Sequence, residues 1–251
     1  MTVSAERYVA AMREVVDGVV VAAETDVHEA ADLIATALRR GGVVQSFGTG
    51  HSQGIAMEIA GRAGGLVPTN RLSPADVVLF GGEEPEVLLE RTLERDPELA
   101  NRLYAITPSR PEDVFVLASS SGVNGCVVEL ALLAKKHGHP VIAITSLEHT
   151  RQVESRHPSG RRLAEVADVV LDNGAPYGDA ILPLPAGGGA ACAISSITGA
   201  LLVQMVVAEV LCRLLDAGED PPLYLSTNVT GGDEHNESLE ARYAGRIRRT
   251  A

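Results

Sequence analysis

The sequence contains, between residues 113 and 122, the stretch Asp113-Val114-Phe115-Val116-Leu117-Ala118-Ser119-Ser120-Ser121-Gly122. Its apolar first half predicts a buried β-strand over 113–117. Three serines and a glycine follow, and then a helical pattern over 127–137. A loop in this position presents free backbone N–H groups and hydroxyls at the positive end of a helix, where anions bind. The stretch therefore predicts a phosphate-binding loop between a strand and a helix.

A loop of the same kind lies earlier in the chain, at Ser46-Phe47-Gly48-Thr49-Gly50-His51-Ser52. In chain order this is the first loop, and residues 118–122 form the second loop. The first loop follows the apolar residues 42–45 and precedes a helix-like stretch over 53–63. Glycine lets a backbone approach a phosphate closely, and a hydroxyl adds a neutral donor. Because the carboxyl ends of parallel strands meet at one edge of a sheet, the two loops predict a small phosphorylated ligand between them.

The rest of the chain alternates strand and helix patterns. Helices are expected at 5–23, 27–38, 53–63, 85–93, 127–137, 193–215 and 239–249. Strands are expected at 42–47, 75–80, 113–117, 141–144 and 167–172, with a strand or turn near 66–68 and a loop over 177–189. This alternation predicts an α/β fold, a three-layer α-β-α sandwich with a mainly parallel sheet. We expect one domain over 1–251, with an N-terminal helical pair in 1–40 and a polar tail over 216–251.

The composition excludes several classes of protein. A net charge of −12 argues against binding to nucleic acid or to an anionic membrane, so a phosphate would be held by local donors. The apolar stretch near 197–215 is interrupted by Gln204, Glu209 and Arg213, which argues against a membrane span. The N-terminus lacks an apolar signal core, so we expect a cytoplasmic protein. The three cysteines share no metal-ligand spacing, and we expect neither a metal nor another cofactor.

The second loop, together with Val141-Ile142-Ala143-Ile144-Thr145-Ser146, resembles the sugar isomerase (SIS) domain, a flavodoxin-like fold that binds phosphosugars. Val123 and Asn124 stand where that family has an acidic residue and a threonine. The first loop is similar to the family's Gly-x-Gly-x-Ser turn. The resemblance implies a homodimer or homotetramer, with the N-terminal helical pair between subunits. The substrate-binding residues that we expect are Gly48, Thr49, Gly50, Ser52, Ser119, Ser120, Ser121, Gly122, Asn124 and Glu234.

An enzyme of this family needs a base to remove a proton beside a carbonyl group. Glu83 and Glu84 follow the expected strand 75–80, where they are either a catalytic base or acids that stabilise a helix start. The segment 80–96 also resembles N-acetylmuramic acid 6-phosphate etherases, SIS enzymes that use glutamates to eliminate a substituent at carbon 3. In that comparison Glu94 falls near one catalytic glutamate.

Two histidines are further candidates. His51 lies inside the first loop, where an imidazole could donate to phosphate or transfer a proton, or simply lie on the surface. His235, with its neighbour Glu234, lies in a polar cluster that either completes the site or begins the last helix.

These observations lead to one functional hypothesis and two alternatives. We expect an enzyme that removes the carbon-2 proton of an amino-sugar 6-phosphate, such as N-acetylglucosamine 6-phosphate, and eliminates at carbon 3 as a dehydratase or lyase. One alternative is an aldose–ketose isomerase, including the phosphoheptose isomerase type. The other is a non-catalytic phosphosugar sensor. A dinucleotide-binding protein is disfavoured because neither loop matches Gly-x-Gly-x-x-Gly.

Overall fold

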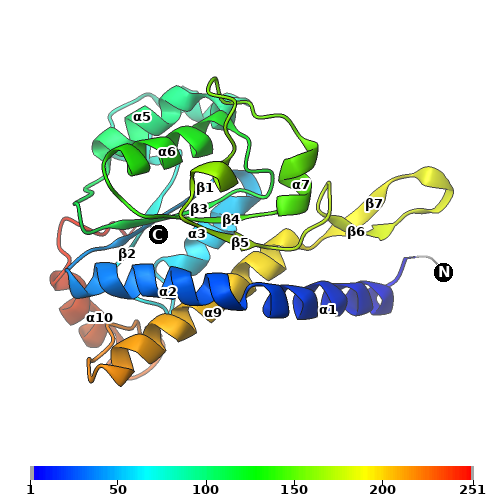
Figure 1. The fold of residues 1–251 in the computed structure, drawn as a ribbon. Helices are drawn as coiled ribbons and strands as arrows, with labels where there is room; N and C mark the ends of the chain where they lie inside the picture. The colour runs from blue at the N-terminus through cyan, green and yellow to red at the C-terminus, as the bar shows by residue number, and fades with distance from the viewer. Residues whose placement is uncertain (1–2, 250–251) are drawn as a thin grey trace.

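One parallel sheet forms the centre of the computed structural model, which describes residues 3–249 (Figure 1). The strand order is β2-β1-β3-β4-β5, and each pair of neighbours is parallel. The strands are β1 (Val44–Gly48), β2 (Thr69–Leu72), β3 (Val114–Ala118), β4 (Val141–Thr145) and β5 (Val169–Asp172). The three central strands are buried along their whole length, as their apolar sequences predict.

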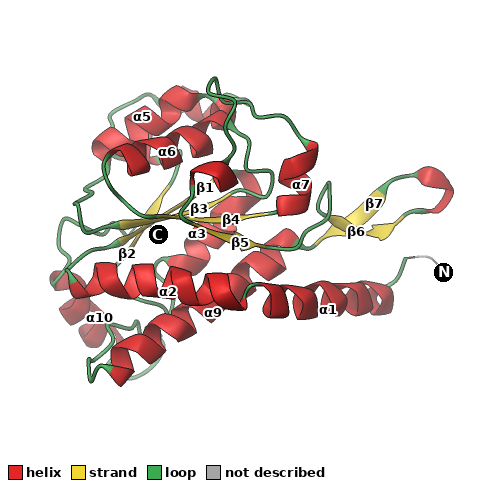
Figure 2. Ribbon diagram, in the orientation of Figure 1, coloured by secondary structure: helices red, strands yellow, loops and turns green. Residues whose placement is uncertain are grey.

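Helices cover both faces of this sheet, so the expected three-layer sandwich is confirmed (Figure 2). One face is covered by α2 (Glu24–Arg39), α3 (Gln53–Ile59) and α9 (Ser195–Asp216). The other face is covered by α4 (Asp76–Leu79), α5 (Pro97–Ile106), α6 (Gly125–Lys136) and α8 (Leu163–Val166). A further short helix, α7 (Leu147–Gln152), follows β4.

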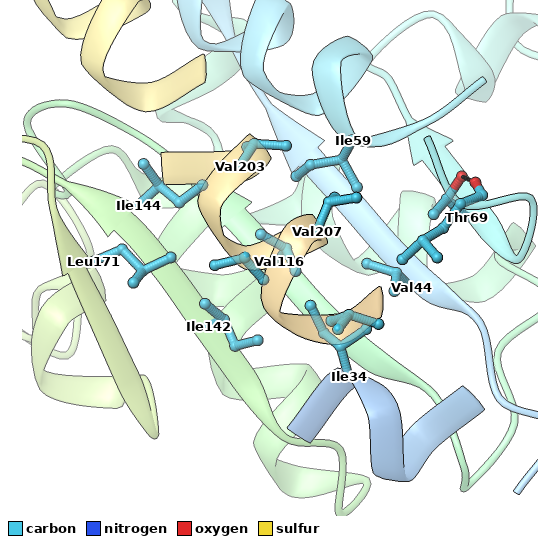
Figure 3. Close-up of a pocket in the computed structure, with 13 residues that line it drawn as sticks. Ile34, Val44, Ile59, Thr69, Val116, Ile142, Ile144, Leu171, Val203 and Val207 are labelled. Atoms are coloured by element: carbon cyan, nitrogen blue, oxygen red, sulfur yellow. Dashed lines mark hydrogen bonds between the residues drawn. The ribbon is translucent and has the colours of Figure 1, made fainter. Parts of the chain in front are cut away.

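The core beneath α9 contains a small cavity of about 30 Å³. Figure 3 shows side chains of α9, among them Val203 and Val207, around this space. Among its lining residues only Thr69 is polar. A space of this size holds about one water molecule, so it is a packing gap in the core and no sugar could enter it.

Two stretches between β2 and β3 differ from the expectation. Residues 75–80 were expected as a strand, but they contain α4. The Ser73 N–H donates a 3.1 Å hydrogen bond to the Asp76 carboxylate, and this bond favours a helical turn at this place. The strand at this place is β2, which continues from the expected turn near 66–68. The expected helix 85–93 is instead two short 3₁₀ turns, Pro85–Leu89 and Leu93–Arg95, and α5 was not anticipated.

The expected loop 177–189 contains one strand of a hairpin. Its strands, β6 (Ala180–Pro183) and β7 (Ala190–Ala193), pair antiparallel and flank the 3₁₀ turn Pro185–Gly187. The hairpin projects beyond the sheet next to α1 (Ala5–Ala22), as Figure 1 shows. Tyr8 of α1 donates a 2.9 Å hydrogen bond to the backbone at the end of β7.

The C-terminal tail packs at the edge of the sheet where the strands begin. Its helix, α10 (Gly232–Ala241), starts earlier than the expected 239–249. Beyond it, the Arg246 guanidinium pairs with the Asp113 carboxylate, which is fully buried just before β3. Asp113 also accepts hydrogen bonds from Val43 N–H and the Gln45 amide, both at the start of β1. This buried network closes the amino edge of the sheet and leaves the opposite edge for a ligand.

The helix α9 is, within residues 3–249, the one that is long and apolar enough to cross a membrane by length and composition. In this fold it packs against α2 and the sheet, with Leu202 and Val210 fully buried. Its other side and the helix α1 remain exposed. Of the 18 residues of α1 only Val19 is buried.

We propose that a second copy of the chain covers these surfaces, giving a homodimer or homotetramer. Val20 and Val21 of α1 are 42% and 77% exposed, and a helix with one buried residue gains little from packing in a monomer. Replacing both valines with glutamate should therefore shift the sedimentation coefficient toward that of a monomer. The control is Leu89→Glu, at an equally exposed apolar position on another segment. A wild-type monomer at micromolar concentration would contradict the proposal.

Candidate functional site

The two predicted loops leave the sheet side by side. Gly48, the last residue of β1, pairs with Ala118, the last residue of β3. The first loop then turns so sharply that a Cβ atom at Gly48 would lie 2.3 Å from the Ser52 carbonyl oxygen. Only glycine fits there. The loop continues as a 3₁₀ turn, Gly50–Ser52, into α3, and the Ser52 N–H is already bonded to the Thr49 carbonyl.

The second loop is held in shape by its own residues and by α7. Gly122 has φ +65°, a conformation that favours glycine, and its N–H donates to the Ser119 hydroxyl at 3.1 Å. The Thr150 hydroxyl donates to the Ser121 carbonyl oxygen. Ser119 is therefore used inside the loop, whereas the Ser121 hydroxyl has no hydrogen-bond partner in the described part of the chain and faces the solvent side.

Two of the helices that begin at this edge have their first N–H groups satisfied by the chain itself. In α7 the Ser146 hydroxyl accepts from the His149 N–H at 2.9 Å. In α9 the Asp179 carboxylate accepts from the N–H groups of Ile194 and Ser195, at 3.2 and 2.8 Å. These two helix starts are capped, so they offer little to an incoming anion.

The start of α6, which follows the second loop, is different. Asn124 occupies the cap position, but its side chain makes no cap bond and instead accepts a 3.2 Å hydrogen bond from Arg156. Within residues 3–249, nothing accepts from the N–H groups of residues 125–127. A helix start of this kind has free donors and a positive dipole end. It is therefore more favourable for a phosphate group than the capped starts of α7 and α9.

A hollow of about 610 Å³ opens in front of this helix start. Its lining residues are Glu94, Ser121, Val123, Asn124, His149, Val153, Glu154, Ser155 and Arg156. A second hollow of about 340 Å³ lies beside the first loop. It is lined by Thr49, Gly50, Gln53, Ser73, Pro74, Ala75, Leu88, Glu90, Arg91, Leu93 and Glu94. Glu94 is common to both, so its carboxyl group lies where the two loops face each other.

A narrow polar gap connects the loops to the later part of the chain. Ser52, Ser120, Asn173, Ser195 and Ser196 line it, together with three apolar side chains. The Ser120 hydroxyl is buried there without a partner in the described residues. Buried polar groups are usually paired, so this hydroxyl is an exception within the described residues.

Glu94 is placed by a close contact between its own turn and α6. A Cβ atom at Gly125 would lie 2.1 Å from the carbonyl oxygen of Arg95, so glycine lets this turn lie against the start of α6. On the other side, Glu94 Oε2 lies 3.8 Å from where a Cβ of Gly50 would be. Its half-buried carboxylate has no ion pair or hydrogen bond among residues 3–249. It is therefore free to act on a ligand.

Glu83 and Glu84 are placed differently. The expectation that they follow a strand was wrong, since the preceding segment is α4. The Glu83 carboxylate is neutralised by Arg102 of α5 at 2.7 Å, and Glu84 is an exposed residue before a 3₁₀ turn. Neither lines the two hollows. Of the three candidate glutamates, the structure brings only Glu94 to both loops.

The candidate histidines also lie outside the hollows. His51 is exposed on the 3₁₀ turn of the first loop. The His235 imidazole hydrogen bonds to the Leu223 carbonyl at 3.0 Å, and Glu234 lies in the first turn of α10. Because α10 packs where the strands begin, neither reaches the loops of its own chain. The cluster lies at the start of the last helix, as one alternative has it, and the cap residue there is Gly231.

Sequence reasoning missed several residues of this edge. His149 and Arg156 follow β4, and Asn173 directly follows β5. Both strands were expected correctly, so His149 and Asn173 could have been found by the rule that led to the two loops, whereas Arg156 lies further from its strand. The Cys126 thiol lies beneath the same edge, and its burial raises its pKa well above the usual range, which makes it unsuitable as a nucleophile.

Comparisons with known proteins show the family and the fold of this chain. The family model of the SIS domain matches residues 7–146. A UPF0309 protein of Geobacillus kaustophilus is 40% identical over 87% of this chain and 86% of its own length. Another UPF0309 protein, from Listeria monocytogenes, is 39% identical over 88% of this chain and 89% of its own.

Solved structures show the same fold. A phosphoheptose isomerase of Neisseria gonorrhoeae covers 82% of this chain and 96% of its own, with a TM-score of 0.56 and 18% identity. One of Francisella tularensis covers 82% and 95%, with a TM-score of 0.56 and 17% identity. At such identities the likeness is one of fold. The family match spans more than half of the chain and includes both loops, and the protein belongs to the SIS domain family.

Proposed function

We propose that this protein is an enzyme that acts on an amino-sugar 6-phosphate, such as N-acetylglucosamine 6-phosphate. In this proposal it removes the proton from carbon 2 and eliminates the oxygen substituent at carbon 3. The observation that carries the proposal is the position of Glu94, a carboxylate without a partner in the described chain, between the two loops.

The phosphate group would lie at the start of α6. The Ser121 hydroxyl lines the hollow there, and the N–H groups of residues 125–127 behind it have no acceptor in the described chain. With the phosphate fixed at this end, the sugar extends past Glu94 toward the first loop. This orientation brings the carbonyl end of the open-chain sugar near the carboxylate, which is what proton abstraction beside a carbonyl requires.

The proposed reaction has two steps, removal of the carbon-2 proton and loss of the carbon-3 oxygen. The Glu94 carboxylate takes the carbon-2 proton, and the electron pair of that bond moves into the carbon-1 carbonyl to give an enolate. When the enolate collapses, the carbon–oxygen bond at carbon 3 breaks, and the leaving oxygen takes a proton from an acid and departs as water. We propose His149 as this acid because it lines the same hollow.

One atom of the His149 ring is unavailable to a ligand. Its Nδ1 atom is buried and has no partner in the described residues, so Nε2 is the ring nitrogen left to contact a ligand. The ring is packed edge-on against Tyr177, with 5.2 Å between the ring centroids.

We favour elimination over isomerisation because Glu94 is the candidate glutamate that reaches the loops. Glu94 is the residue to which the resemblance with the etherases points, whereas the other two glutamates lie elsewhere. Isomerisation would use the same enolate but return the proton to carbon 1. The two outcomes therefore share the first step and differ in the product.

Proton exchange in heavy water, followed by NMR, tests the first step directly. Wild-type protein should exchange the carbon-2 proton of a hexosamine 6-phosphate. Glu94→Gln should lower that rate by about 10²–10⁴-fold, because the base is lost while the phosphate contacts remain. Glu83→Gln is the matched control and should retain nearly full exchange.

Four results would count against the proposal. Full exchange in Glu94→Gln would exclude this residue as the base, and loss of exchange in Glu83→Gln would make Glu83 the base instead. Binding without any exchange across hexose, hexosamine and heptose phosphates would favour the sensor. A ketose product without loss of water would favour the isomerase.

The contact between Gly125 and the Glu94 turn gives a second prediction. In Gly125→Ala the new methyl group meets the Arg95 carbonyl at 2.1 Å, so the turn must move. A displacement of about 1 Å can cost about 10²-fold in rate, and we expect such a loss in carbon-2 exchange. Gly54→Ala is the control, since a Cβ there meets no atom within 4 Å. Normal exchange in Gly125→Ala would contradict the proposed placement of the base.

A further inference from the structure

Arg156 lies beside the second loop, on the segment between α7 and α8. The Arg156 backbone N–H donates to the Val123 carbonyl at 2.9 Å, and its guanidinium donates to the Asn124 side chain at 3.2 Å. Both acceptors belong to the link between the second loop and α6. The side chain is thereby held at the rim of the hollow that contains Ser121.

The charge of this arginine is not neutralised by its own chain. Across residues 3–249 no carboxylate lies within 4.0 Å of its guanidinium. Other exposed arginines share this property, but among the described residues Arg156 is the arginine that lines the hollow beside the second loop. A guanidinium has five N–H donors, and one of them is used on Asn124. In a chain with a net charge of −12, an unpaired cation at the rim of an anion-binding hollow is informative.

The segment that carries Arg156 is fixed on both sides of it. The next residue, His157, contacts the Glu129 carboxylate of α6 at 2.7 Å. Further along, the Leu163 N–H donates to the Gly122 carbonyl at 2.8 Å. The backbone of this segment is therefore anchored to the second loop and to α6, and little conformational freedom remains to be lost when a ligand binds.

We infer that Arg156 is a phosphate-binding residue, and that Asn124 serves to position it. The ligand group is the dianion of a phosphate monoester. Resting on the proposed function, this inference adds a charged contact to a site that the sequence predicted to rely on neutral donors. It also explains why Asn124 leaves the helix start uncapped, because its side-chain oxygen is used on Arg156.

Titration calorimetry with inorganic phosphate and with N-acetylglucosamine 6-phosphate tests this inference. A hydrogen bond between charged groups is roughly twice as strong as a neutral one, so Arg156→Gln should weaken both ligands by about 10- to 100-fold. Arg156→Lys keeps the charge but loses the planar fork of donors. Its affinity for each ligand should lie between that of the wild type and that of Arg156→Gln. Arg151→Gln is the control, because Arg151 is an exposed residue of α7 that does not line the hollow.

Two further measurements separate binding from positioning. Asn124→Ala should weaken phosphate by several-fold but less than Arg156→Gln does. The affinity of Arg156→Gln should also lose part of its dependence on salt, which a purely structural role would not change. Thermal unfolding of each variant verifies that the fold is retained.

The results distinguish this inference from the proposed function. If Arg156→Gln binds both ligands as the wild type does while Ser121→Ala does not, Arg156 is not a ligand and the phosphate site stands. If both variants bind normally, or if wild-type protein binds neither ligand, the inference and the proposed site fail together. Equal losses in Arg156→Gln and Arg151→Gln would indicate a general effect of charge and would also overturn it.

Discussion

The uncapped start of α6 is the feature on which the rest of the site depends. Its first N–H groups have no acceptor in the described chain, while α7 and α9, which begin at the same edge, are capped by Ser146 and Asp179. Free donors at a helix start are stabilised by an anion. In the proposed function this difference gives the ligand a direction, with its phosphate at the second loop and its sugar extending toward the first. The placement of Glu94 between the loops has chemical meaning only because that end is fixed.

The two edges of the sheet differ in how their charged side chains are paired. At the amino edge, the buried Asp113 carboxylate joins the starts of β1 and β3 to Arg246 of the tail, so these two charges are used within the fold. At the carboxyl edge, the Glu94 and Arg156 side chains have no partner of opposite charge within residues 3–249. Unpaired charges cost little stability at a solvated rim, but they are what a charged ligand needs. The charges that stabilise the fold and the charges left for the proposed ligand thus lie at opposite edges of the sheet.

The sequence predicted the sheet well and the site in part, for physical reasons. Strands such as β3 and β4 are buried on both faces, so their apolar runs were unambiguous. The run at 75–80 is equally apolar, but the Asp76 carboxylate binds a backbone N–H and starts a helix, a local bond that hydrophobicity does not report. Glu94 was indicated only by resemblance, because its turn has no regular pattern. Arg156 could not be found, because its place depends on hydrogen bonds between segments far apart in sequence.

The central claim is that the second loop holds a phosphate group, and the most direct test compares two ligands on one variant. In Ser121→Ala, the affinity for N-acetylglucosamine 6-phosphate should fall by about 10-fold or more, since a hydrogen bond to a charged group is lost. The affinity for unphosphorylated N-acetylglucosamine should stay within about twofold of the wild-type value. An equal loss for both ligands, or no loss for either, would contradict the account.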